Sequence, residues 1–136
     1  MATKMGSRRK TPKKPIKKKS RSSLKLKLDL LFSKYIRDRA DNKCEYCGKT
    51  GRVECHHGVV HRRYMNTRYE PDNCIVLCGG CHRFFSDFPK INIEFFRKKI
   101  GSDRMEQLEI LARSQVKPDL EQIEADLKVK IKKMEG

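Results

Sequence analysis

The sequence contains no tryptophan, and hydrophobic residues occupy only 37% of its 136 positions. A chain of this length forms one domain, and so little apolar surface predicts a small core that needs another source of stability. No stretch approaches the roughly 18 consecutive apolar residues of a transmembrane helix, and no apolar segment follows the basic N-terminus as it would in a secretory signal. We therefore expect a cytoplasmic protein without a membrane partner.

Acidic residues are missing from the first 28 positions, which carry twelve of the 33 Lys and Arg residues. The chain has a formal net charge of +16, whereas residues 29–136 contain 21 basic and 17 acidic residues and so contribute only +4. Residues 1–23 contain two prolines and no apolar periodicity, and we expect them to form a disordered arm that binds the phosphates of a polyanion such as DNA. A solubilising tail is the alternative.

An apolar stripe at helical spacing follows the arm. Its members are Leu24, Leu28, Leu31, Phe32, Tyr35 and Ile36. Spacings of three and four place these side chains on one face, so residues 24–43 are predicted to form a leading helix that docks on the core. Residues 52–57 and 58–61 look like two strands. Residues 91–136 are predicted to form C-terminal helices, one capped by Asn92 and one amphipathic over residues 120–134.

Six cysteines, two of them followed directly by histidine, indicate metal binding in a chain without a secretory signal. Four of them form two CxxC pairs: Cys44, Cys47, Cys78 and Cys81. Two intervening residues let both thiolates of a pair bind one tetrahedral ion, and Gly48 suits the positive φ of such a turn. We expect one structural Zn²⁺ that compensates for the small core, with buried free thiols or a redox pair as the alternative. Cys55 and Cys74 lack this spacing and are predicted to be core residues.

The histidines lie inside and beside this cysteine frame. In chain order the relevant residues are His56, His57, Asn73 and His82. This order resembles the HNH (His-Asn-His, ββα-metal) endonucleases, and within them it is most similar to the bacteriophage NinG-type recombination endonucleases. The likeness lies in residues 31–37, 44–47, 56–57, 62–64, 67–73 and 77–82, so that the region of resemblance covers roughly two thirds of the chain.

The resemblance implies a small α+β fold, with a ββα-metal (His-Me finger) core on the four-cysteine zinc frame over residues 44–90. It implies that His57 is the general base, that His56 and His82 bind a catalytic divalent ion, and that Asn73 orients the base. An imidazole titrates near neutrality and therefore suits a base, and adjacent strand residues face opposite ways, so His56 and His57 have different roles. The alternative is that these histidines belong to the structural zinc or are hydrogen-bonded core residues.

Ser86 occupies the position at which some members of that family have a second histidine on the helix. The catalytic ion would then have two protein ligands, together with water and DNA phosphate. This indicates a loosely held Mg²⁺ or Mn²⁺, and the two imidazoles leave another transition metal open.

Four residues between the His-His pair and Asn73 are predicted to contact DNA: Arg62, Arg63, Tyr64 and Arg68. Arginine binds phosphate through two parallel hydrogen bonds, although a solvated basic loop is the alternative. The chain is thus predicted to be a metal-dependent DNA endonuclease of a phage or prophage, working in the bacterial cytoplasm on double-stranded or branched DNA. Cutting both strands would require a homodimer, for which residues 120–134 offer a contact. A non-catalytic zinc-ribbon module that binds nucleic acid is the rival hypothesis.

Overall fold

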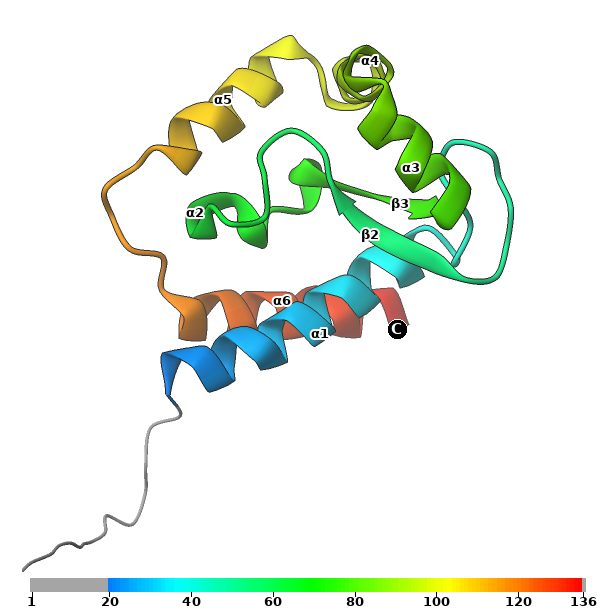
Figure 1. The fold of residues 1–136 in the computed structure, drawn as a ribbon. Coiled ribbons are helices and arrows are strands. Elements are labelled where there is room, and N and C mark those ends of the chain that lie inside the picture. The colour runs from blue at the N-terminus through cyan, green and yellow to red at the C-terminus, as the bar shows by residue number, and fades with distance from the viewer. Residues whose placement is uncertain (1–19, 136) are drawn as a thin grey trace, which may run out of the picture.

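The computed structural model describes residues 20–135, which form a small α+β fold with a two-stranded sheet and six α-helices (Figure 1). In chain order the elements are α1 (Arg21–Arg39), β2 (Val53–His57), α2 (Met65–Arg68), the 3-10 turn η2 (Pro71–Asn73), β3 (Cys74–Cys78), α3 (Gly79–Asp87), α4 (Pro89–Ile100), α5 (Ser102–Ala112) and α6 (Leu120–Glu135). None of the helices in this part of the chain is both long and apolar enough to cross a membrane.

Helix α1 is the predicted leading helix. The hydroxyl of Ser20 accepts a hydrogen bond from the Ser23 N–H at 3.1 Å and caps the first turn. The apolar stripe is its buried face, with Leu28 and Ile36 fully enclosed. The prediction of a disordered arm over residues 1–23 is wrong for residues 21–23, because the Ser20 cap starts the helix at Arg21. Residues 1–19 of that arm lie outside the described residues.

Strands β2 and β3 pair antiparallel, with Val53 opposite Cys78 and His57 opposite Cys74. The predicted second strand over residues 58–61 is wrong. The Asn73 side chain accepts hydrogen bonds from the N–H groups of Val59 and Val60 at 3.1 and 2.7 Å. These donors are therefore used in a loop and cannot join a strand ladder.

The two faces of the sheet pack against different helices. Residues 53, 55 and 57 of β2 face α1 and α6, together with Cys74 and Val76. The other face carries Ile75 and Leu77 and packs on the phenylalanines of α3 and α4 (Figure 1). The sheet is thus the middle layer between two helical layers, and adjacent residues of β2 reach different surroundings.

Helix α6 lies along α1, and its Leu120 and Leu127 are buried against that helix (Figure 1). The apolar face that could have joined two copies is therefore used within the chain. The homodimer stays a prediction, as does the division of the chain into an arm, a leading helix, a nuclease core and C-terminal helices, apart from the start of the leading helix at Arg21.

Gly58 follows β2 at a point where the backbone passes very close to Phe96. A Cβ atom at this position would lie 1.9 Å from Cε2 of the fully buried Phe96 ring. We expect Gly58→Ala to lower the free energy of unfolding by about 1–3 kcal/mol, because the packed ring has to move. Gly79→Ala is the matched control, since a Cβ there has nothing within 4 Å. It should change the unfolding free energy by under about 0.5 kcal/mol in urea denaturation, and equal values for both variants would contradict the prediction.

Candidate metal centre and histidine site

The four cysteines of the two CxxC pairs come together where the turn over residues 44–47 meets the end of β3 and the start of α3. Their sulfur atoms all lie within 4.8 Å of one another, and the Cys47 and Cys78 sulfurs are 3.8 Å apart. A tetrahedral zinc with Zn–S bonds of about 2.3 Å has S–S edges of about 3.8 Å. The predicted frame therefore forms, and it could hold a metal ion such as zinc.

The surroundings of Cys44 favour a thiolate. The N–H of Cys47 points at the Cys44 sulfur from 3.4 Å. Burial raises the pKa of Cys44, but the N–H groups of Cys47, Cys78 and Tyr46 outweigh it and bring the pKa to about 6. The thiolate is the form that binds metal, so the local backbone prepares this sulfur for an ion. Gly48 has φ 81°, as the turn was predicted to require.

Glu45 fastens the first cysteine pair to the edge of the sheet. Its N–H donates to the Val76 carbonyl at 2.8 Å, and its carboxylate accepts from the Val76 N–H at 2.8 Å. Lys99 of α4 pairs with the other carboxylate oxygen at 3.1 Å. The cysteine frame is thereby attached to β3 and α4 independently of any ion.

His56 and His82 face each other on the α3 side of the sheet, with ring centroids 5.0 Å apart. His56 Nε2 lies 2.8 Å from the side-chain oxygen of Asn92, and His82 Nδ1 bonds to the carboxylate of Glu54. Both partners are acceptors, so these two nitrogens carry protons, and in the neutral rings the lone pairs lie on His56 Nδ1 and His82 Nε2. Acceptors that orient histidines in this way are typical partners of metal-binding imidazoles.

No third ligand-bearing side chain among the described residues joins His56 and His82 in a close group. Within residues 20–135, three or more potential ligand atoms come within 4.8 Å of one another only in the cysteine frame and at Cys55, His57 and Cys74. Burial lowers the pKa of His56, which keeps this ring neutral and able to act as a ligand. The assignment of His56 and His82 to a catalytic ion stays a prediction.

Asn92 is a site residue that the sequence did not reveal. Helix α4 begins at Pro89, which suits the first helical position, so the prediction of an Asn92 cap is wrong. Instead the Asn92 amide donates to the Gly58 carbonyl at 2.8 Å and turns its oxygen to His56. Nothing in the local sequence distinguishes this bridging role from a helix cap.

His57 lies on the α1 face of the sheet, opposite to His56, as the alternation of strand residues predicts. Its Nε2 lies 3.0 Å from the Arg68 carbonyl oxygen. Since a carbonyl only accepts, Nε2 carries the proton and the lone pair is on Nδ1. Burial lowers the pKa of His57 to about 4, so the ring is neutral at pH 7.

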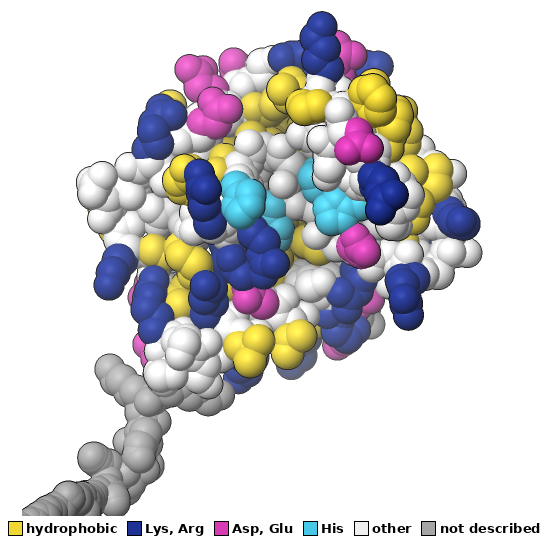
Figure 2. Space-filling model, in the orientation of Figure 1, with side chains coloured by type: hydrophobic (Ala, Val, Ile, Leu, Met, Phe, Trp, Pro, Cys, Tyr) yellow, Lys and Arg dark blue, Asp and Glu magenta, His cyan; other side chains and the backbone are white. Residues whose placement is uncertain are grey.

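A cavity of about 300 Å³ lies beside His57. Arg37, Arg62 and Ser33 line it together with Asp29. Figure 2 shows histidine side chains near the middle of one face, with Lys and Arg side chains around them. A lone pair that is available at neutral pH thus lies next to a pocket with two cationic side chains.

Asn73 is completely buried and holds the loop that follows β2. Besides accepting from Val59 and Val60, its amide donates to the Val60 carbonyl at 2.9 Å. Its own carbonyl accepts from the Gly58 N–H at 2.9 Å. Asn73 therefore fixes the path of the chain directly after His57, which agrees with a positioning role; its part in catalysis stays a prediction.

Replacing Asn73 by alanine should lower the free energy of unfolding by about 3 kcal/mol, because the buried N–H and carbonyl of Val60 and the part-buried N–H of Val59 lose their partner. Urea denaturation followed by circular dichroism would measure this loss. Asn66→Ala is the control: its amide bonds to the Ser114 carbonyl at the surface, and we expect a change under about 0.5 kcal/mol. Equal losses for the two variants would show that the loop does not depend on Asn73.

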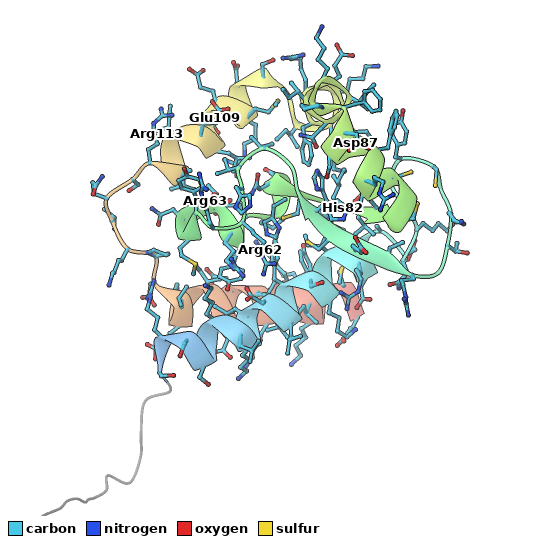
Figure 3. The ribbon with its side chains drawn as sticks, in the orientation of Figure 1. Arg62, Arg63, His82, Asp87, Glu109 and Arg113 are labelled. Atoms are coloured by element: carbon cyan, nitrogen blue, oxygen red, sulfur yellow. The ribbon has the colours of Figure 1, made fainter. Side chains whose placement is uncertain are left out.

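The four residues predicted to contact DNA do not share one environment. Arg62, Arg63 and Tyr64 are exposed on the loop between β2 and α2, where Figure 3 labels both arginines. Arg68 is only 6% exposed, and two of its nitrogens donate to the carboxylate of Asp29 at 2.8 Å each. The DNA contacts stay predictions, and the geometry favours Arg62 and Arg63 over Arg68 for this role. Asp29, which the sequence did not single out, is the residue that binds Arg68.

Comparison with known proteins identifies a family to which nearly the whole chain is similar. A family model described as bacteriophage lambda NinG protein matches residues 2–136, nearly the whole chain. Among curated proteins and among solved structures no significant match is found. The matched region includes the cysteine frame, the three site histidines and Asn73.

Proposed function

The chain belongs to the bacteriophage lambda NinG protein family, and from that premise we propose that it is a metal-dependent DNA endonuclease of the HNH type that serves phage recombination. The observation that carries the proposal is the arrangement of β2, β3 and α3. Strand β2 presents His56 and His57 on opposite faces, and α3 presents His82 across from His56. This order of strand, strand and helix supports a ββα-metal core on the cysteine frame.

The donor set fits a divalent ion at the His56 and His82 pair. The free lone pairs on His56 Nδ1 and His82 Nε2 would hold it, with Asn92 and Glu54 orienting the rings. When bound, the ion supplies positive charge against the scissile phosphate and the leaving oxygen. Mg²⁺ and Mn²⁺ are the candidate ions, and imidazole ligands also admit other transition metals.

His57 is the proposed general base. The Arg68 carbonyl holds its ring through Nε2, so Nδ1 is free to take a proton from water. Attack of that water on a phosphodiester would leave 5′ phosphate and 3′ hydroxyl ends. One such site cuts one strand, so resolution of a branched junction would need two copies of the chain.

Arg62 and Arg37 are the proposed phosphate contacts of this site. Both line the cavity beside His57, and the Arg62 side chain is 57% exposed. Arg63 stacks over the Tyr64 ring at 5.0 Å and extends the basic surface along the loop. Two cationic side chains in the cavity that His57 also lines would bind the DNA backbone on the face of the sheet where His57 lies.

A nicking assay on supercoiled plasmid tests the proposal. The purified chain is incubated with Mg²⁺, Mn²⁺, Ni²⁺ or Co²⁺, with EDTA as the control, and the ends of the product are labelled to identify the 5′ phosphate. A four-way junction and a linear duplex of the same sequence are compared for rate. If the chain binds DNA but cuts none of these substrates with any metal, the rival hypothesis of a non-catalytic zinc module replaces this one.

Deleting residues 1–19 should weaken DNA binding and reduce its dependence on salt. This segment holds nine Lys and Arg residues, and its removal leaves the Ser20 cap of α1 in place. Each phosphate contact adds about 0.9 to the slope of log affinity against log salt, so we expect the slope to fall by several units. The nicking rate at saturating DNA should change less than about twofold, because such contacts position but do not react. An unchanged salt slope, measured by fluorescence anisotropy, would show that the segment does not bind DNA.

A further inference from the structure

A second group of metal-binding side chains lies on the α1 face of the sheet, separate from the cysteine frame. Ligand atoms of Cys55, His57 and Cys74 all lie within 4.8 Å of one another. Cys55 and His57 share a face because they alternate along β2, and Cys74 is the residue opposite His57 in β3. The register of the sheet thus brings two sulfurs and one imidazole together.

The three side chains offer suitable donors for a soft cation. His57 Nε2 donates to the Arg68 carbonyl, which leaves Nδ1 as a donor to metal. The Cys55 and Cys74 thiols hydrogen-bond with each other, which lowers the pKa of Cys55, whereas burial raises the pKa of Cys74, so that an arriving ion has to displace the Cys74 proton. Two thiolates and one neutral imidazole would neutralise a dication, and this ligand set is one that zinc accepts with a fourth position left open.

The cavity beside His57 provides both an entry path and room for a fourth ligand. Cys55 and His57 line this space of about 300 Å³, whereas Cys74 is fully buried behind them. An ion could therefore reach the group from the cavity without the sheet opening. A water molecule in the cavity could then complete a tetrahedral site.

We propose that Cys55, Cys74 and His57 form a second site for a thiophilic divalent ion such as Zn²⁺ or Cd²⁺, and that its occupancy takes His57 away from catalysis. The second half of this statement rests on the proposed endonuclease function. Mg²⁺ and Mn²⁺ bind thiolates poorly, so the ions that would activate the enzyme leave this site empty. Hard ions such as Mg²⁺ would then activate the enzyme, whereas thiophilic ions such as Zn²⁺ or Cd²⁺ would inhibit it.

Cobalt titration of the reduced full-length chain, loaded beforehand with only the one equivalent of Zn²⁺ that fills the four-cysteine frame, tests the site without any need for activity. Co²⁺ binds more weakly than Zn²⁺ and leaves the four-cysteine frame occupied, and tetrahedral thiolate-bound Co²⁺ absorbs in the visible range. We expect one equivalent of Co²⁺ to give this absorption in the wild type, and Zn²⁺ or Cd²⁺ to remove it. Cys55→Ala and Cys74→Ala should abolish it, and His57→Gln should weaken and shift it.

The control variant is His61→Ala, which changes an exposed histidine outside the group and should keep the full cobalt signal. Zinc content and circular dichroism show whether each variant retains the frame and the fold. If replacing the buried Cys74 unfolds the chain, the Cys55→Ala and His57→Gln variants still test the site, because both of these residues are only half-buried. Absence of the cobalt signal from the wild type, or its full retention in folded Cys55→Ala, would overturn the proposal.

Inhibition is measured separately as the ratio of nicking rates with and without excess Zn²⁺ at fixed Mn²⁺. We expect zinc to slow the wild type about 10²-fold or more, in line with the loss of a general base, and to slow Cys55→Ala far less. A chain that shows the cobalt signal but never nicks DNA refutes the endonuclease and leaves the metal site standing. A chain that nicks DNA but lacks the cobalt signal refutes the second metal site and leaves the endonuclease proposal standing.

Discussion

Replacing His57 by alanine is expected to lower the rate of DNA nicking by about 10²–10⁴-fold, the usual contribution of a general base. The neutral ring, held by the Arg68 carbonyl, is the proposed proton acceptor, and its removal leaves the water without one. The apparent affinity for the catalytic metal should stay the same, because His57 faces away from His56 and His82. A metal titration of the nicking rate at saturating DNA measures both quantities.

His56→Ala and His82→Ala should behave differently from His57→Ala. Each removes one of the two proposed ligands, so part of the activity should return at high Mn²⁺. His61→Ala is the matched control on the neighbouring loop and should keep its rate within about twofold. If metal rescues His57→Ala but neither of the other two, the base and the ligand are exchanged. If His82→Ala releases zinc, the histidine belongs to the cysteine frame and the nuclease proposal loses its metal site.

The parts of the molecule that local spacing determines could be predicted from the sequence. The stripe of Leu24, Leu28, Phe32 and Ile36 predicted α1, because a helix places every third or fourth residue on one face. The two CxxC pairs predicted the sulfur cluster, since each pair forms its turn alone. The opposite orientation of His56 and His57 followed from strand geometry in the same way.

The parts that depend on distant contacts could not be predicted. The segment 58–61 has strand-like residues, yet Asn73, about 14 residues away, takes up its donors. Asn92 resembles a helix cap, and only the packing of α4 on the sheet places its amide between Gly58 and His56. Arg68 looks like a DNA contact until α1 supplies Asp29. In each case a polar side chain has a partner that its neighbours in sequence do not reveal.

Cys78→Ser should unfold the domain rather than merely slow the enzyme. The two hydrophobic clusters of the described chain are small, and one of them includes Cys44 and packs against Cys78 and Cys81. Metal binding contributes about 10–16 kcal/mol in zinc-finger peptides, as much as the whole folding free energy of an ordinary domain. Losing one of four ligands therefore removes a large share of what keeps the chain folded.

Zinc content and circular dichroism of Cys78→Ser, beside the wild type treated with a chelator, measure this effect. We expect both samples to lose zinc together with most of their helical signal and to show no cooperative thermal transition. Cys55→Ala is the matched control: this half-buried cysteine lies outside the frame, so its variant should keep the zinc of the four-cysteine frame and the fold. A Cys78→Ser protein that binds no zinc and still unfolds cooperatively near the wild-type temperature would show that the frame does not stabilise the fold. The sheet would then owe its position to Glu45 and to the helices packed on its two faces, not to the ion.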